Sequence, residues 1–399
     1  MRDIPIKNHY LPIWLRHVKV LAEDIGPRGS TTEKEKEASD YCQQVFRDLH
    51  LTPQMETFKS AKSIYHPHLL ASTFMLLAFV LYPLYGRTSA ALAALISLVT
   101  YASQLFELSL RDNIFRRIVP KGDSQNVITV IPPEEEHKQD LVLIGHVDSH
   151  RTPVIFSSPA WLKAYQTFTT VAFLLGLMQI SLYIIGSFTL WSWIWPVTIL
   201  SALSAATLAA LCIQADRTPF SAGANDNATA AGLLLTLAQH FQDDPLQNTG
   251  VWLVCSGCEE VQHYGAIDFF RRHTAELKNP VALVFEMMGC AGPSWLTKEG
   301  IIIPFRSDPT LVQLAEQVAE ANPHLGAYPS QINGGNTEMA DALRVGIPAI
   351  TLDGMSRDGE APYWHQVEDT YDKMDPEVMA RSYEFTWEYI TAIDSMLPK

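Results

Sequence analysis

Short apolar runs alternate with helical segments over much of the chain. The runs that predict buried strands are residues 126–131, 141–144, 250–254, 281–285 and 349–352. The segments that predict helices are residues 228–241, 265–274, 309–321 and 376–397. Strands that alternate with helices predict an α/β fold, with a mostly parallel or mixed central sheet and helices on both faces.

The first sixty residues have a different pattern. Residues 1–60 are expected to be helical and soluble, and residues 30–32 (SerThrThr), followed by Glu33 and Glu35, predict a helix that begins there and runs to about Leu51. The first twenty residues lack an apolar core of signal-peptide length, so no cleaved signal is expected.

Four longer apolar segments interrupt the α/β pattern. They are residues 69–85 and 90–106, then residues 164–188 and 190–213. Segments near 20 residues match the hydrocarbon thickness of a bilayer. Core helices of a soluble domain are the alternative, but two tight hairpins favour the membrane. We therefore predict four transmembrane helices in two hairpins, at residues 65–110 and 162–215, inserted into a single domain of residues 1–399.

The charges beside these hairpins predict their orientation. Basic residues flank the hairpins on the side of the remaining domain: Lys59, Lys62, Arg111, Arg116, Arg117, Lys163 and Arg217. Only Arg87 lies in a tip loop. We therefore expect an integral membrane protein with the lipid bilayer as a partner, and the positive-inside rule predicts that its main domain is cytoplasmic.

Composition excludes some classes of function. The formal net charge is -14, which argues against a nucleic-acid partner because phosphate binding requires basic patches. The five cysteines form no disulfide framework, so a reducing compartment is expected. Cys255 and Cys258 form a lone CxxC, which is interpreted as two buried thiols in preference to a redox or structural zinc site.

Charged residues stand at the ends of three predicted strands. His146 and Asp148 follow the first of these strands, Glu259 and Glu260 follow the second, and Glu286 follows the third. Open α/β sheets place their sites at the carboxyl ends of strands. Buried carboxylates need a cation or another partner, so the pattern predicts a metal site.

Two further residues extend this set. Asp226 lies in the segment GlyAlaAsnAspAsnAla at residues 223–228, at the start of a predicted helix, and His365 lies in a late loop. Judged singly, Asp226 is more often a helix N-cap and His365 an ordinary loop histidine.

Taken in order, these motifs resemble the co-catalytic zinc aminopeptidase family. That family includes bacterial leucyl aminopeptidases and the glutamate carboxypeptidase and transferrin-receptor proteins. The resemblance rests on HisValAsp at 146–148, the segment at 223–228, the GluGlu pair, the acid at 286, and His365 followed by AspThrTyrAsp at 369–372. It covers about residues 10–60 and 120–399. Residues 334–338 and 345–349 also resemble the family's late substrate-side loop and the strand after it.

The resemblance implies roles for these residues. His146 and Glu286 would hold one zinc, Glu260 and His365 would hold a second, and Asp226 would bridge the two. Asp148 would support the site, and Glu259 would act as the general base. The expected cofactor is therefore two zinc ions per chain, and the expected substrate is a peptide.

The chain departs from the family pattern at three points. Glu286 stands where Asp is usual. Trp364 stands immediately before His365, where many members have Tyr, so oxyanion stabilisation falls to Tyr363 or to zinc alone. The second hairpin separates His146 from Asp226.

The function expected from the resemblance is a membrane-associated metallopeptidase, in particular an aminopeptidase. A catalytically silent binding or receptor protein on the same fold is one alternative, and a glutaminyl cyclase-like enzyme with fewer metal ligands is another. Four other histidines are expected to be solvated or structural: His150, His240, His263 and His273. The sequon at Asn227 is interpreted as part of the site loop and not as a glycan acceptor.

Overall fold

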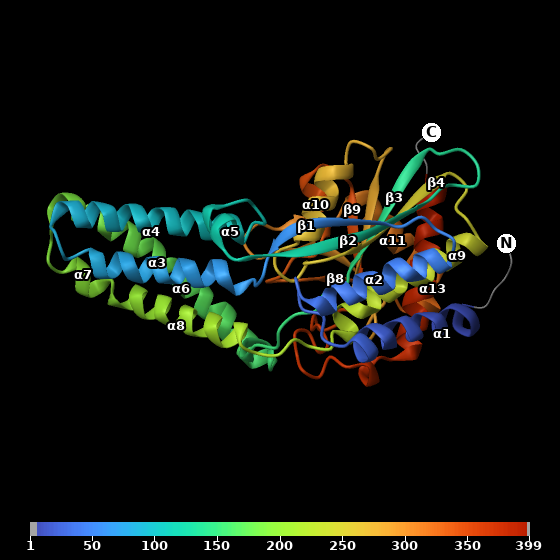
Figure 1. Cartoon of the computed structure of the whole chain (residues 1–399), viewed down its shortest axis with the longest axis horizontal. Coiled ribbons are helices and arrows are strands. Elements are labelled where there is room, and N and C mark those ends of the chain that lie inside the picture. Colours follow the sequence, from blue (N-terminus) through green and yellow to red (C-terminus); the bar gives the residue numbers. More distant parts are fainter. Residues whose placement is uncertain (1–5, 397–399) are drawn as a thin grey trace. The chain divides into compact units, whose positions relative to one another are not determined.

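The computed structural model describes residues 6–396, which form two compact units (Figure 1). Unit 1 comprises the described residues up to Ser60, then Gly122–His150 and the residues from Phe220 onward. Unit 2 comprises Ala61–Lys121 and Arg151–Pro219, and therefore contains the predicted hairpin regions.

A mixed sheet forms the centre of unit 1. Its strands are β1 Gln54–Ala61, β2 Lys121–Ile131, β3 Gln139–His146, β4 Thr249–Ser256, β5 Val281–Glu286, β6 Ser294–Glu299, β7 Phe305–Arg306, β8 Tyr328–Gln331 and β9 Ala349–Asp353. The order is β1-β2-β4-β3-β5-β9-β6-β7, with β8 beside β6. Strands β4, β3, β5 and β9 are parallel, whereas β2 and β6 join them antiparallel. The predicted sheet is thus mixed, with a parallel centre.

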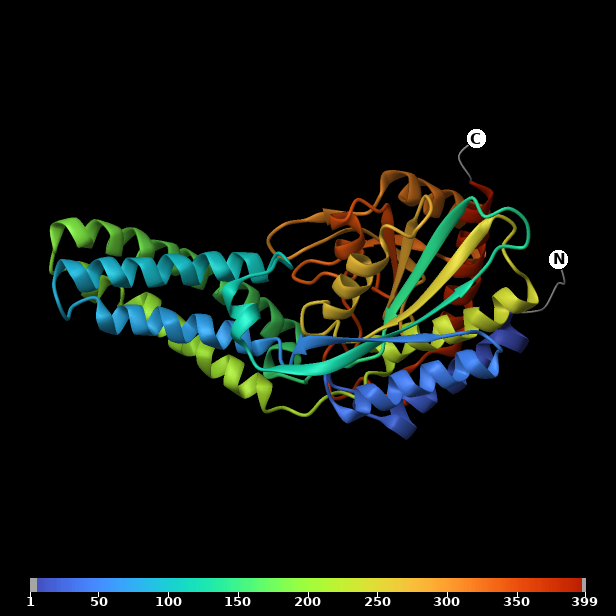
Figure 2. The ribbon, with the colours of Figure 1, turned by 45° about the horizontal axis from the view of Figure 1, so that its top comes forward.

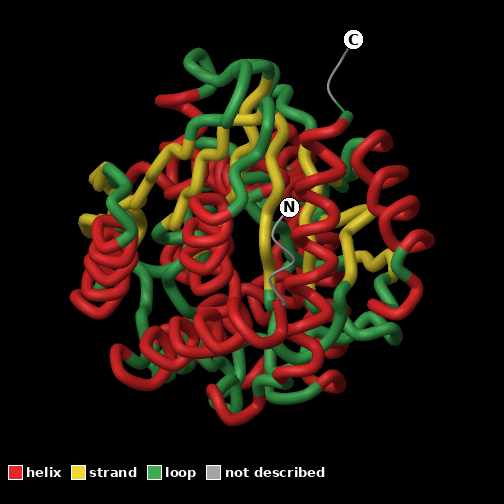
Figure 3. The backbone as a smooth tube through the Cα atoms, turned by 90° about the vertical axis from the view of Figure 1, so that its right-hand side faces the viewer, coloured by secondary structure: helices red, strands yellow, loops and turns green. Residues whose placement is uncertain are grey.

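Alternate residues of the central strands fill two separate cores. On β3, Leu141 and Leu143 belong to one core, whereas Val142 and Ile144 belong to the other. The larger core receives α1 Ile6–Lys19, α2 Glu33–Asp48, α9 Thr229–Asp243, α11 Pro309–Ala321 and α13 Pro376–Ser395. The smaller core receives α10 Tyr264–His273 and α12 Met339–Arg344. Because successive side chains of a strand point to opposite faces, both faces of the sheet are covered by helices (Figures 2 and 3).

Helix α2 begins where the sequence predicts it. The side chain of Thr32 accepts a hydrogen bond from the Glu35 amide at 3.3 Å, and the Glu35 carboxylate accepts one from the Thr31 amide at 2.7 Å. This reciprocal capping satisfies amides that have no partner within the helix. One short π-helix, η1 Val20–Ile25, lies between α1 and α2.

The prediction that residues 1–60 are helical is wrong at its end, because β1 is a strand there. The segment is largely polar, and it lies at the edge of the sheet, where only one side of the strand is paired. A strand of this kind lacks the apolar run that marks a buried one.

Unit 2 is a bundle of apolar helices (Figure 1). Its helices are α3 Tyr65–Leu81, α4 Arg87–Glu107, α5 Ile114–Ile118, α6 Pro159–Thr189, α7 Ile194–Val197 and α8 Ile199–Asp216. Helix α3 packs against α4 and α8, and α6 packs against the same two helices. The four long helices therefore enclose a common interior.

Three segments of this bundle are long and apolar enough to cross a membrane: Arg87–Glu107, Pro159–Thr189 and Ile194–Asp216. The expectation of four such helices is corrected to three. Helix α3 is apolar but has only 17 residues, because the pair Tyr82–Pro83 and the turn after it end the helix. At 1.5 Å per residue it spans roughly 25 Å, less than the ~30 Å of a hydrocarbon core.

Candidate metal centre

The carboxyl ends of three adjacent strands form one side of the site. His146 is the last residue of β3, and it pairs in register with Ser256, the last residue of β4. Glu259 and Glu260 follow β4 after a short turn, and Glu286 is the last residue of β5. Since β3 lies between β4 and β5 and is parallel to both, these three strand ends meet at the same edge of the sheet.

Two loops complete the site with Asp226 and His365. The carboxylate of Asp226 lies between the two histidines, with Oδ1 at 3.4 Å from Nε2 of His146 and Oδ2 at 3.3 Å from Nε2 of His365. His365 also lies 3.3 Å from Oε2 of Glu260, and His146 lies 3.4 Å from Oε1 of Glu286. The structure thus brings the five predicted ligands together, although they come from positions far apart in the sequence.

These separations suit a metal ion better than direct hydrogen bonds. Charge-assisted N–H···O bonds are usually ~2.7–2.9 Å long. Two donors that each lie ~2.0–2.1 Å from one tetrahedral zinc are instead roughly 3.3–3.4 Å apart. His146, Asp226 and Glu286 form one group with metal-ligand spacing, and Glu260 and His365 belong to a second. Within the described chain, Oε1 of Glu260 is buried without a hydrogen-bond partner.

The charges of the site also fit a cation. Burial and the nearby Asp226 carboxylate raise the pKa of Glu260 to about 8, and burial raises the pKa of Glu286 well above its usual value. The carboxylates outweigh burial at His365 and raise its pKa to about 10. Among the residues described, the acids at positions 226, 259, 260 and 286 form ion pairs with histidines but with no lysine or arginine. A divalent cation would supply the missing positive charge.

Asp148 holds the two-glutamate turn in place. Its carboxylate accepts hydrogen bonds from the amides of Glu259 and Glu260, each at 3.2 Å, and from the hydroxyl of Ser30 at 2.6 Å. The Asp148 carboxylate also lies 3.5 Å from Nδ1 of His146. The residue therefore contacts the backbone of the neighbouring strand end as well as the histidine.

Asp369 and Arg28 position the loop that carries Asp226. Asp369 accepts hydrogen bonds from the amides of Asn225 at 2.6 Å and Asp226 at 3.1 Å. Arg28 is fully buried, and its guanidinium donates to the carbonyls of Leu21, Gly26, Val147, Ala222 and Gly223. It therefore links η1, the end of β3 and the start of the Asp226 loop, η3 Ala224–Ala228. No local pattern marks Arg28 as part of the site, because all but two of these partners are more than 100 residues away.

Two histidines expected to be solvated or structural lie at the site. His150 is buried, its ring stacks on that of His365 with 3.6 Å between centroids, and it can join Glu260 and His365 as a metal-holding group. His263 is buried next to Glu259, with 3.0 Å between Nε2 and Oε1. Both side chains are buried, so the solvated alternative of that expectation does not hold for them, whereas the structural alternative is not contradicted.

The other two histidines of that set have structural surroundings. His240 stacks on Trp387 in the larger core, with 3.4 Å between centroids. His273 lies at the end of α10 between the carboxylates of Glu56 and Glu276. Both side chains are largely buried, so neither is solvated.

Asn227 belongs to the site loop. It is fully buried, and its side-chain amide donates to the Phe285 carbonyl at 3.0 Å and to Oε2 of Glu286 at 3.1 Å. These contacts fix the acid that departs from the family pattern. A fully buried side chain is a poor glycan acceptor, in agreement with the expectation for this sequon.

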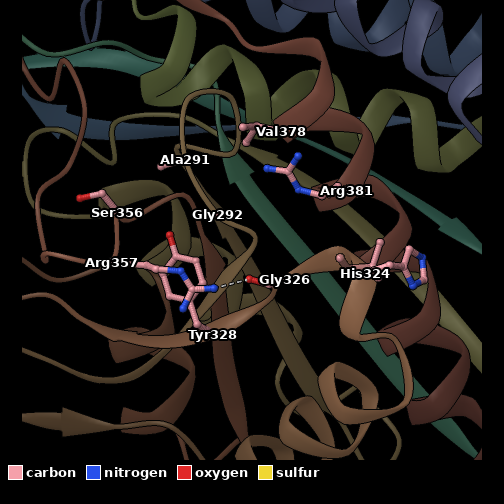
Figure 4. A pocket seen from close by; sticks show the side chains of 10 residues that line it. Ala291, Gly292, His324, Gly326, Tyr328, Ser356, Arg357, Val378 and Arg381 are labelled. Atoms are coloured by element: carbon pink, nitrogen blue, oxygen red, sulfur yellow. Dashed lines mark hydrogen bonds between the residues drawn. The ribbon is translucent and has the colours of Figure 1, made fainter.

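A pocket of about 430 Å³ lies elsewhere on unit 1 (Figure 4). Arg357 covers the ring of Tyr328 at 4.0 Å and donates to the Gly326 carbonyl at 2.9 Å, and Arg381 lines the same pocket. None of the residues that line it belongs to the metal-holding groups.

Comparison with known proteins shows what the chain is similar to. Residues 210–390 match the model of peptidase family M28. Comparison with curated proteins finds no match. Among solved structures, a leucine aminopeptidase precursor from Bacteroides thetaiotaomicron is similar, with 13% identity, a TM-score of 0.56 and 96% of each chain covered.

Two further structures have the same degree of similarity. The glutaminyl cyclase of Fimbriiglobus ruber has 16% identity and a TM-score of 0.56, with 96% of this chain and 95% of that chain covered. The zinc aminopeptidase BSAP from Bacillus subtilis has 14% identity and a TM-score of 0.56, with 95% of this chain and 94% of that chain covered. At these identities the structures establish a shared fold. The match of residues 210–390 to peptidase family M28, on the fold of the zinc aminopeptidases, confirms the family resemblance that the motifs predict.

Proposed function

We propose that the chain is a membrane-anchored di-zinc aminopeptidase. His146 and Glu286 would hold one zinc, Glu260 and His365 the second, and Asp226 both. The observation that carries the proposal is the Asp226 carboxylate, each of whose oxygens faces a different histidine at 3.3–3.4 Å. A single metal would not need a carboxylate in this bridging position.

Glu259 is proposed as the general base. Its Oε2 lies 3.8 Å from Nε2 of His146, and Glu259 itself forms a group with metal-ligand spacing together with His146 and Glu260. Bound zinc supplies a Lewis acid that polarises the scissile carbonyl and lowers the pKa of water. Glu259 then takes the proton of the attacking water and passes it to the leaving amine. The peptide C–N bond breaks, and one water is consumed.

The test combines metal content with hydrolysis of peptides that have a free N-terminus. The protein, purified in detergent, is expected to bind about two zinc ions per chain and to release N-terminal residues. Glu259→Gln should keep the zinc and lose hydrolysis by roughly 10²–10⁴-fold, whereas Glu316→Gln, at an exposed position of α11, should match the wild type. Full zinc occupancy without hydrolysis would favour the silent binding protein. Unchanged activity in Glu259→Gln would refute the role of the base.

A glutaminyl cyclase is the second candidate, because glutaminyl cyclases are among the similar structures. Peptides that begin with Gln separate the two activities. A cyclase converts the N-terminal Gln to pyroglutamate with loss of ammonia, whereas an aminopeptidase releases free Gln. The residues proposed to hold two zinc ions support hydrolysis over cyclisation, because a glutaminyl cyclase-like site is expected to have fewer metal ligands.

Oxyanion stabilisation remains a choice between Tyr363 and zinc alone. Tyr363 is half-buried two residues before His365. If its hydroxyl stabilises the oxyanion, Tyr363→Phe should lower kcat by about 10²-fold or more with little change in KM. An unchanged kcat assigns this task to zinc.

We also propose that unit 2 is inserted in a bilayer, with unit 1 in the cytoplasm. Leucines of its long helices are exposed and would face lipid: Leu77, Leu92, Leu95, Leu98, Leu174, Leu177, Leu200 and Leu203. Large apolar surfaces of this kind are rare on proteins in water. The basic residues next to the helices in the sequence, where the chain passes between unit 2 and unit 1, support the orientation.

Labelling of single introduced cysteines tests this topology. With an impermeant maleimide on intact cells, Arg87→Cys at the exposed start of α4 should react, whereas Arg271→Cys on the surface of unit 1 should react only after permeabilisation. The reverse pattern would refute the orientation. If each variant were labelled equally in intact and in permeabilised cells, insertion would be refuted.

A further inference from the structure

A buried histidine lies between the proposed base and a second carboxylate. Nε2 of His263 is 3.0 Å from Oε1 of Glu259, and Nδ1 is 2.7 Å from Oδ2 of Asp341. All three side chains are nearly excluded from solvent. The imidazole therefore joins the turn after β4 to helix α12, in a continuous chain of three ionisable groups.

The backbone directs His263 toward Glu259. The carbonyl of Glu259 accepts hydrogen bonds from the amides of Gln262 at 2.9 Å and His263 at 2.8 Å. Gln262 and His263 have φ values of 83° and 58°, in the left-handed region that side chains with a Cβ rarely adopt. This tight turn reverses the chain just before α10 begins at Tyr264, and it returns the ring of His263 to the carboxylate of Glu259. Strained backbone of this kind persists where the surrounding structure fixes it.

The charges around His263 favour a ring that donates from both nitrogens. Burial alone would lower the pKa of His263, but the carboxylates of Glu259 and Asp341 outweigh it and hold the pKa well above its usual value. A ring protonated on both nitrogens is a donor to each neighbour. One oxygen of Glu259 is thereby occupied, and the other, Oε2, remains on the side of His146.

We infer that His263, oriented by Asp341, is a positioning residue for the general base: it holds Oε1 of Glu259, so that Oε2 alone is presented to the attacking water. This inference rests on the proposed function, because it assigns a role that acts through the base. Asp341 fixes the ring through Nδ1, as carboxylates that orient a histidine do in other sites. Without His263, the Glu259 side chain would rotate between conformations, and only some of them would place an oxygen at the water.

Variants of the full chain in detergent test the inference, with zinc content, zinc affinity, kcat and KM as readouts. His263→Gln is expected to lower kcat by about 10- to 100-fold, with KM and zinc affinity unchanged. Asp341→Asn should give part of the same loss. The double variant His263→Gln/Asp341→Asn should be no worse than His263→Gln, because both act on the same carboxylate.

A second double-mutant cycle, between His263 and Glu259, distinguishes a positioning role of His263 from a structural role. In the Glu259→Gln background, His263→Gln should cause no further loss of kcat, since the group on which it acts has gone. The matched control is His273→Gln: His273 is also buried between two carboxylates, at the other end of the same helix. It should change the melting temperature but not kcat.

Each outcome has a defined meaning. If His263→Gln lowers kcat equally in the wild-type and Glu259→Gln backgrounds, or if it weakens zinc binding as much as it lowers kcat, the inference is wrong. The same holds if His263→Gln has wild-type kcat. An inactive wild-type protein with both zincs bound refutes the proposed function instead, so the two failures are distinguishable.

Discussion

Replacement of Arg28 tests the internal support of the metal centre. Its guanidinium donates to five carbonyls, four of them in buried residues, and burial lowers its pKa to about 10, so it remains charged at neutral pH. In Arg28→Lys the ammonium has three donors, so at least two carbonyls lose their partner. Each buried carbonyl left unsatisfied costs about 1–3 kcal/mol, which gives a total of about 2–6 kcal/mol. This corresponds to a fall of roughly 5–20 °C in melting temperature for a unit of this size.

Thermal unfolding of the detergent-solubilised protein, followed by tryptophan fluorescence, measures this loss. Zinc content should be measured on the same samples, because Arg28 donates hydrogen bonds to the carbonyl of Val147, next to His146, and to those of Ala222 and Gly223, just before the Asp226 loop. Arg47→Lys, at an exposed position of α2, is the control for the change of residue type. Equal melting temperatures for the two variants would show that the five hydrogen bonds do not stabilise the loop as argued.

Three further predictions concern the acids of unit 1. In Asp148→Asn, the new NH₂ group must face at least one of three donors, which are the amides of Glu259 and Glu260 and the Ser30 hydroxyl. The variant should therefore be less stable by about 1–3 kcal/mol, as measured by thermal unfolding. It should also have a lower kcat in peptide hydrolysis. Burial raises the pKa of Glu299 to about 8 in the folded protein, whereas the pKa of this residue in the unfolded chain is ~4.3. The protonated side chain therefore stabilises the fold fully below pH ~4.3, and this stabilisation is lost as the pH rises through about 8. Glu299→Gln, whose amide oxygen can keep the bonds from Thr337, should therefore melt above the wild type near pH ~9 and close to it near pH ~5, and equal differences at both pH values would contradict this. Removal of metal with a chelator should lower the melting temperature, because the site carboxylates lose their cation. The loss of unfolding free energy should be about 3–4 kcal/mol if free zinc had been several hundred-fold above its dissociation constant. Glu259→Gln should show the same dependence on zinc, since the proposed base is not one of the five proposed ligands.

The strand-end residues were predictable because a local pattern marks them. A buried strand needs an apolar run, and His146, Glu259, Glu260 and Glu286 each follow such a run within six residues. Parallel neighbours then bring the ends together. The helix cap at Thr32 is equally local, since its partner Glu35 is three residues away.

Other features had no such local mark. The edge strand β1 is largely polar, so its sequence does not distinguish it from a helix or a loop. The length of α3 depends on where the chain turns after Leu81, and mean apolarity does not show this. His150 and His263 lie in ordinary polar contexts, and only the folded chain reveals that both are buried beside the metal-holding residues.

The sequence by itself determined the fold class, the family resemblance and the residue types of a metal site, because hydrophobic periodicity and short motifs depend on neighbours a few residues apart. Tertiary structure alone decided how those residues are held. Arg28 donates hydrogen bonds to carbonyls up to 195 residues away in the sequence. Asp369 accepts a hydrogen bond from the Asp226 amide, 143 residues before it, and His263 contacts Asp341, 78 residues after it. Contacts of this kind arise from the packing of whole helices and strands, so no local pattern encodes them.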